Sequence, residues 1–189
     1  MEPPLRADAR RNRARLLEAA ERVLTEKGPD APTDEIAKAA GVGIGTLFRH
    51  FPTKEALIEG VLAARMRRMA DEAARLAPAA DGLEVFLRHA VEQAGVKNAL
   101  AGLLTSAGVD LTATIDGVRD DLTTALGALL STAQQAGAVR RDLRVADLIG
   151  LLAGASRAVE YAASDESSRE RIMAVIIDGL RPHPTPADE

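Results

Sequence analysis

The stretch from residue 33 to residue 54 constrains the fold of this chain more than any other part of its sequence. The hydroxyl of Thr33 can cap a helix, and the two acidic residues that follow stand where a helix dipole favours negative charge. Gly41 then ends this helix, because glycine enters the left-handed conformation without a steric penalty. The pattern therefore predicts a short helix that is closed by a tight glycine turn.

A second short helix is predicted from Ile44 to His50. Only Leu47 and Phe51 are obvious inward-facing anchors. The residues expected to face outward are Ile44, Gly45, Thr46, Arg49 and His50. Two short helices joined by a tight turn form a helix-turn-helix. A helix of about seven residues is roughly 10 Å long, and the DNA major groove is about 12 Å wide. We therefore expect the second helix to read DNA.

Three short motif segments follow one another closely in this stretch: residues 36–42, 45–51 and 54–57. Together they resemble the N-terminal domain of the TetR family of bacterial transcriptional regulators. The resemblance implies that some side chains contact phosphate and that others lie near base edges. The implied phosphate contacts are Thr33, Phe48, His50 and Lys54, and the implied base contacts are Ile44, Gly45, Thr46 and Arg49.

Two residues depart from the family pattern. Family members commonly carry Tyr where this chain has Phe48, so a hydroxyl contact to phosphate is missing. Many also carry Ser or another polar residue at Gly43, so the cap of the second helix is weaker. Neither departure removes the predicted fold.

Composition favours an all-α protein without a metal or cofactor site. The chain has 189 residues, of which 47% are hydrophobic, and it contains no Trp, one Tyr and three Phe. Such a composition favours helix over sheet. No Cys is present, which excludes disulfides and thiolate ligands, and no apolar run approaches the roughly 20 residues that span a membrane. We expect a cytoplasmic protein of one compact helical domain or two small ones.

Charge is distributed unevenly along the chain. The net charge of the whole chain is −4, yet residues 1–68 carry 13 basic and 10 acidic side chains. Between Arg6 and Arg15, five arginines crowd into ten residues. A solvated first helical turn and a DNA-contacting arm both explain this run; beside a helix-turn-helix we assign Arg10 and Arg11 to DNA.

The predicted organisation comprises four parts and about nine helices. Residues 1–9 are expected to be a disordered arm, 10–53 the DNA-binding domain, 54–181 a ligand-binding and dimerisation domain, and 182–189 a disordered tail. The fourth helix should run from Lys54 to about Leu76, long enough to leave the DNA-binding domain. The later helices are predicted at about 82–94, 96–106, 110–136, 144–164 and 167–181, with breaks at Gly95, Gly108 and Gly137. Thr53 and Ser168 are expected to cap the starts of the fourth helix and of the last helix.

The last two predicted helices are apolar around more than one face, which indicates either a central position or a subunit interface. The TetR resemblance implies a homodimer that is formed through these two helices. The interface candidates are Leu148, Leu151, Leu152, Ala155, Ile172, Ile176 and Leu180.

The middle helices could surround a pocket for a small molecule. For the apolar candidates, simple core packing is the more frequent explanation. Arg157 stands among apolar residues, and either Glu160 or a ligand carboxylate could be its partner. The pocket candidates are Met66, Met69, Phe86, His89, Leu103, Leu104, Leu122, Leu126, Arg157 and Tyr161.

No motif of an enzyme stands out in the sequence. A phosphate-binding glycine loop, a metalloprotease His pair and a nucleophile elbow are all missing, and the three histidines are scattered. The sequence thus predicts a dimeric DNA-binding regulator, most simply a repressor released from a palindromic operator by a small molecule. The alternative is a helical ligand-binding or protein-interaction module that has lost operator binding.

Overall fold

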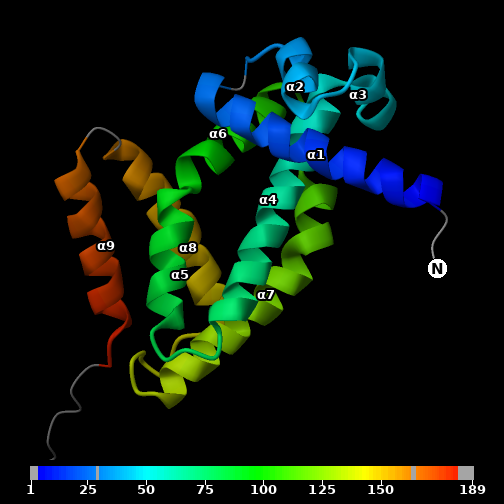
Figure 1. Cartoon of the computed structure of the whole chain (residues 1–189). Coiled ribbons are helices and arrows are strands. Elements are labelled where there is room, and N and C mark those ends of the chain that lie inside the picture. The colour runs from blue at the N-terminus through cyan, green and yellow to red at the C-terminus, as the bar shows by residue number, and fades with distance from the viewer. Residues whose placement is uncertain (1–3, 29, 163–164, 183–189) are drawn as a thin grey trace, which may run out of the picture. The chain divides into compact units, whose positions relative to one another are not determined.

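The structure, a computed structural model, describes residues 4–28, 30–162 and 165–182. These residues form nine α-helices and no strand, which confirms the predicted all-α class (Figure 1). The helices are α1 (Pro4–Lys27), α2 (Thr33–Ala40), α3 (Ile44–His50), α4 (Lys54–Leu76), α5 (Gly82–Glu92), α6 (Ala94–Ser106), α7 (Thr112–Gln135), α8 (Val145–Tyr161) and α9 (Glu166–Leu180).

The N-terminal part differs from the expected disordered arm. Helix α1 begins at Pro4, so residues 4–9 lie in its first turns. Proline is favoured at the start of a helix because its missing N–H would have no partner there. Residues 1–3 of the expected arm and 183–189 of the expected tail lie outside the described residues.

The chain divides into two compact units, 1–65 with 96–117 and 66–95 with 118–189. Helices α4 and α7 each contribute residues to both units. The predicted domain boundary after residue 53 stays a prediction, because the units group residues by packing and not by function.

The first unit holds the helix-turn-helix against α1. Helix α2 packs on α1 and on α3, and Leu16, Ile36 and Leu47 are fully buried. Burying one such side chain stabilises a fold by about 1.5–3 kcal/mol. Helix α4 is tied to α1 by an ion pair in which Nη1 of Arg65 lies 2.6 Å from Oε1 of Glu21.

The second unit has its own hydrophobic core, formed by the end of α4 and by α5, α7, α8 and α9. Helix α8 packs on α5 and on α9, and the three lie side by side in Figure 1. Phe86, Leu126 and Leu129 are fully buried in this core. The loop before α8 is fastened to α9, since the backbone N–H of Arg140 donates to the carbonyl of Leu180 over 2.8 Å.

Most predicted breaks between helices agree with the structure, and two details do not. Helices α6 and α7 end before Gly108 and Gly137, as expected. Gly95 lies inside α6, however, and the break falls at Gln93. Asp165, and not Ser168, precedes the first residue of α9. No helix in the described part of the chain is long and apolar enough to cross a membrane.

Candidate nucleic-acid interface

The turn between α2 and α3 is built from backbone hydrogen bonds. Gly41 has φ of 69°, in the left-handed region that glycine enters most easily. Its N–H donates to the carbonyl of Lys38, and the N–H of Val42 donates to that of Ala37 over 3.0 Å. These bonds satisfy the last carbonyls of α2 and redirect the chain toward α3. The helix begins at Thr33 itself, and no side chain caps it, so the expected Thr33 cap is wrong.

Helix α3 exposes one continuous face. Leu47 is fully buried and anchors the helix, and Phe51 is buried just after it. Successive residues of a helix are about 100° apart, so Ile44, Phe48, Gly45 and Arg49 follow one another around an arc of roughly 140°. All four are exposed. We call this arc the outward face of α3.

The remaining predicted contacts lie beside the outward face or at neighbouring helix starts. Thr46 and His50 of α3 are half-buried. Thr33 and Lys54 are also half-buried, and each is the first residue of its helix. A cation at a helix N-terminus opposes the dipole, so an anionic partner such as phosphate would stabilise Lys54 there.

The start of α4 is held by the predicted Thr53 cap. The backbone N–H of Ala56 donates to Oγ1 of Thr53 over 3.1 Å, which confirms the cap. The Glu55 backbone N–H and then the Thr53 hydroxyl donate to the Glu55 carboxylate and hold the pKa of Glu55 below its usual value. Glu55 is therefore ionised at neutral pH, and Lys54 stands beside a fixed negative charge.

The arginines of α1 have different environments. Arg10 and Arg11, the predicted DNA contacts, are exposed. Arg15 instead donates from Nη2 to the carbonyl of Ala40 over 3.0 Å and so covers the end of α2. The guanidinium of Arg13 lies 4.9 Å from the centre of the Phe51 ring, within the range of a cation–π interaction. Neither structural role could be predicted from the basic run, because charge alone does not show which groups a side chain contacts.

Two family descriptions match this chain. "Bacterial regulatory proteins, tetR family" matches residues 16–61. "Transcriptional regulator SbtR-like, C-terminal domain" matches residues 77–182, which is more than half of the chain. The chain belongs to the TetR family. It is accordingly a DNA-binding transcriptional regulator, and α3, with its exposed outward face, stays the predicted recognition helix.

Solved structures of TetR regulators share the fold over nearly the whole chain. A TetR transcription regulatory protein from Mycobacterium vanbaalenii is 42% identical, with a TM-score of 0.76, over 95% of this chain and 100% of that one. The regulator SCO0520 from Streptomyces coelicolor is 35% identical, with a TM-score of 0.71, over 91% and 99%. At these identities and coverages, the likeness extends to both compact units.

Curated relatives match a smaller share of this chain. The "Uncharacterized HTH-type transcriptional regulator TtgW" of Pseudomonas putida is 42% identical over 60 residues, or 31% of this chain. That match spans 45% of the Pseudomonas relative. A separate match, to the HTH-type regulator SAUSA300_2515 from Staphylococcus aureus, spans 29% of that regulator. The chain thus matches less than half the length of these curated relatives, and they say nothing of what its second unit binds.

The predicted pocket residues have no common environment. Phe86 and Leu126 are fully buried in the second core, and Leu104 is fully buried in the first unit. Tyr161 is 95% exposed. The other six are Met66, Met69 and Leu122, which are half-buried in the second unit, Leu103, which is half-buried in the first, and His89 and Arg157, which are exposed in the second.

The polar pocket candidates have partners within the chain. Nη1 of Arg157 donates to Oε2 of Glu160 over 2.9 Å, as the internal alternative predicted. Nδ1 of His89 lies 2.8 Å from Oε1 of Glu72. An ion pair explains Arg157 without a ligand, so its role in a ligand pocket stays a prediction.

The interface candidates divide into two groups. Four are buried in the chain's own core, where packing within one subunit accounts for them: Leu148, Leu152, Ala155 and Leu180. The other three are half-buried and, together with the buried Ala155, line an open pocket between α8 and α9: Leu151, Ile172 and Ile176.

Gly45 provides a direct test of the outward face. A Cβ added at Gly45 would meet no atom within 4 Å, and alanine stabilises a helix by up to about 1 kcal/mol relative to glycine. We therefore expect Gly45→Ala to keep or raise the melting temperature. We also expect it to lower operator affinity about tenfold or more, because the added methyl stands where the backbone approaches the base edges. Thermal unfolding and fluorescence anisotropy measure the two effects.

Gly102→Ala is the matched control for that substitution. Gly102 is exposed in the interior of α6, and a Cβ there also meets no atom within 4 Å. It should raise stability and leave operator affinity unchanged. Equal operator affinity of Gly45→Ala and the wild type would remove Gly45 from the interface with DNA.

Proposed function

We propose that this protein is a homodimeric repressor that binds a palindromic operator and is released from it by a small molecule. It would act in the cytoplasm, where bacterial promoters are found. A two-fold dimer places two recognition helices about 34–36 Å apart, one helical turn of DNA. Such an arrangement matches a protein two-fold axis to a palindrome.

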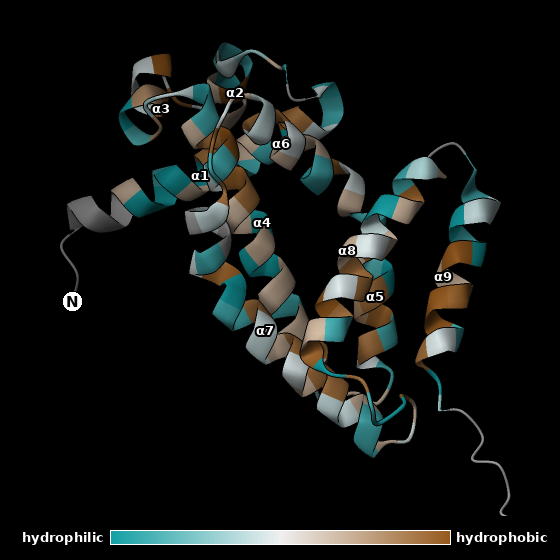
Figure 2. Cartoon of the chain, turned by 180° about the vertical axis from the view of Figure 1, so that it is seen from behind, coloured by the Kyte–Doolittle hydropathy of each residue, from teal (hydrophilic) through white to brown (hydrophobic). Residues whose placement is uncertain are grey.

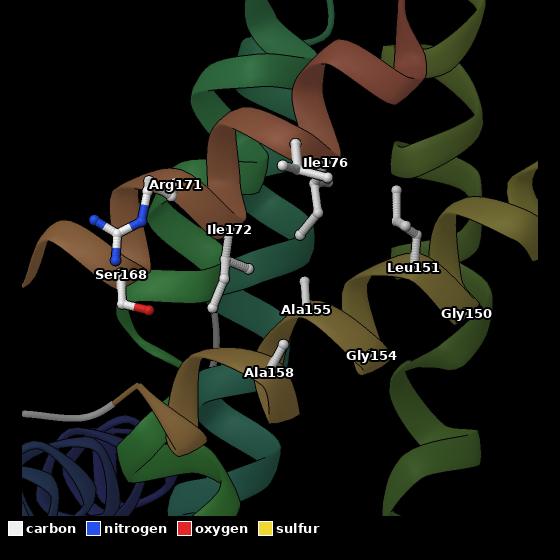
Figure 3. A pocket seen from close by; sticks show the side chains of 10 residues that line it. Gly150, Leu151, Gly154, Ala155, Ala158, Ser168, Arg171, Ile172 and Ile176 are labelled. Carbon is white, nitrogen blue, oxygen red and sulfur yellow. The ribbon is translucent and has the colours of Figure 1, made fainter. Parts of the chain in front are cut away.

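The main observation that supports a dimer is an apolar groove on the second unit. The groove lies between α8 and α9 and has a volume of about 520 Å³. Figure 3 shows side chains of the two helices pointing toward one another across it. The α8 side contributes Gly150, Leu151, Gly154, Ala155 and Ala158, and the α9 side contributes Ser168, Arg171, Ile172, Val175 and Ile176.

The shape and chemistry of this groove fit a second copy of the chain. Gly150, Gly154 and Ala158 are four residues apart, so they form one stripe of small side chains along α8. A stripe of small residues allows another helix to approach closely. Val175 is 72% exposed on the opposite wall, and a large apolar side chain so placed gains free energy when a partner covers it. The family resemblance, which implies pairing through the last two helices, supports the same occupant.

The proposed release rests on the continuity of two helices. Helices α4 and α7 each contribute residues to both compact units. A ligand that binds one conformation of the second unit better than another would shift the population toward that conformation. Helix α4 would transmit the shift to the recognition helix, and operator affinity would fall. By linkage, the operator would weaken ligand binding by the same factor.

Fluorescence anisotropy with the DNA upstream of the protein's own gene tests operator binding. Unrelated DNA is the control, and both are titrated over a salt series. We expect affinity for the upstream DNA to exceed that for the control by about a thousandfold or more, a typical specificity ratio. The logarithm of the affinity for the upstream DNA should fall linearly with the logarithm of salt concentration, because phosphate contacts release counterions. Absence of binding to either DNA at low salt would instead support the module that has lost operator binding.

A further inference from the structure

The outward face of α3 carries two large apolar side chains. The exposed fractions are 38% for Ile44 and 41% for Phe48. They are four residues apart, so they lie one above the other on the helix surface. Figure 2 shows hydrophobic segments on α3 among hydrophilic ones. Leu47 already anchors the helix from its buried side, so the fold does not need this second apolar pair.

The surroundings of the pair favour nucleic acid as the occupant. Arg49 is exposed beside it on the same arc, and Lys54 begins the next helix. A protein partner that covered the pair would have to desolvate the Arg49 side chain, whereas DNA phosphates attract it. The part of a DNA major groove that matches an apolar side chain is the C5-methyl group of thymine.

We propose that Ile44 and Phe48 read thymine methyl groups in each operator half-site. This inference rests on the proposed operator binding and adds the chemistry of recognition to it. Phe48 has no hydroxyl to donate to phosphate, so its ring contributes apolar contact alone. Its position in the middle of the outward face places it beside Ile44, and the two side chains form one apolar surface.

The rest of the outward face completes the recognition pattern. Gly45 lacks a side chain, which leaves room for the groove edge to approach the helix backbone. Arg49 can donate two hydrogen bonds to O6 and N7 of guanine. We therefore expect each half-site to contain the contacted thymines and, next to them, a guanine.

The experiment uses the full chain and an operator enriched from a random duplex pool. Each thymine of the operator is replaced in turn by deoxyuridine, which removes the methyl group and keeps the pairing edge. Burial of one methyl group corresponds to about a three- to fivefold change in affinity. We expect such a loss at one or two positions of each half-site for the wild-type protein, measured by fluorescence anisotropy.

Variants assign the methyl groups to their readers. Ile44→Ala or Phe48→Ala should bind the thymine and deoxyuridine duplexes equally at the position that each residue reads. Lys54→Ala, which removes a phosphate contact, should weaken binding to both duplexes and keep their ratio. Because both apolar side chains are exposed, neither truncation opens a core cavity.

The possible outcomes separate this inference from the proposed function. Specific binding that is insensitive to every deoxyuridine would overturn methyl recognition and leave the regulator intact. A sensitive thymine whose effect persists in both alanine variants would also overturn it. Failure of the random pool to yield any preferred sequence would remove operator binding itself, and the inference with it.

Discussion

Val175→Asp is expected to convert the protein from a dimer to a monomer and to abolish tight operator binding. Val175 is 72% exposed in the single chain, so an aspartate there costs the subunit fold little. In the proposed dimer, however, each groove would bury this carboxylate. An uncompensated buried charge costs about 3–5 kcal/mol, which weakens the dimer more than a hundredfold. Sedimentation velocity at micromolar concentration measures the change.

Ala174→Asp is the matched control for Val175→Asp. Ala174 is exposed on the same helix and does not line the groove. It adds the same charge to α9, so it should remain dimeric and bind the operator as the wild type does. A dimer of unchanged affinity in Val175→Asp would exclude the groove as the subunit interface. Loss of dimer in both variants would show that charge anywhere on α9 disrupts association.

Operator binding should follow the oligomeric state of these variants. A monomer contacts one half-site at a time, so it loses the second set of phosphate and base contacts. The Val175→Asp protein is therefore expected to bind a half-site duplex and the full operator with similar weak affinity. The recognition helix lies in the other compact unit, so its own contacts are unchanged.

The sequence predicted the helix-turn-helix well because its signals are local. Gly41 ends α2 in a conformation that glycine adopts most easily, and Leu47 supplies the single buried anchor of α3. Local backbone geometry and one helical period were sufficient to place both helices. The exposure of Gly45 and Arg49 was also predictable, since each lies about 160° from Leu47 on the helical wheel. Ile44 lies only about 60° from Leu47, so the wheel alone does not explain its exposure.

The faces of α8 and α9 could not be assigned from the sequence. Both helices are apolar around more than one side, and helical periodicity does not say which stripe covers the subunit's own core. Leu148 and Leu152 proved to face that core, while Leu151 lines the groove. Val175, which was not among the predicted interface residues, is the most exposed apolar side chain of the groove. Tertiary packing decides between these stripes.

The partners of some side chains in the first unit also could not be predicted from the sequence. Arg13 and Arg15 belong to a basic run whose composition suggests nucleic acid, yet they contact Phe51 and the end of α2. Their partners lie 25 or more residues away along the chain. Only the packing of α1 on α2 brings such groups together.

Gly82→Ala is expected to destabilise the second unit by about 3 kcal/mol or more. A Cβ at Gly82 would lie 2.1 Å from the carbonyl oxygen of Leu76 and 3.2 Å from Cδ2 of Leu129. The Leu129 side chain can move, but the oxygen is backbone. It also accepts the N–H of Ala79 over 3.0 Å in the turn between α4 and α5. The backbone must therefore shift, and the turn that holds the two helices together is disturbed.

Urea unfolding, followed by far-UV circular dichroism at one protein concentration, measures this loss. Gly179→Ala is the control in the same unit, because a Cβ in that part of α9 meets no atom within 4 Å. The control should keep the midpoint or raise it, since alanine favours helix over glycine by up to about 1 kcal/mol. A Gly82→Ala midpoint equal to that of the wild type would mean that the chain leaves α4 by a wider turn. Opposite shifts in the two variants would instead establish that a missing side chain at Gly82 permits the close approach of α5 to the end of α4.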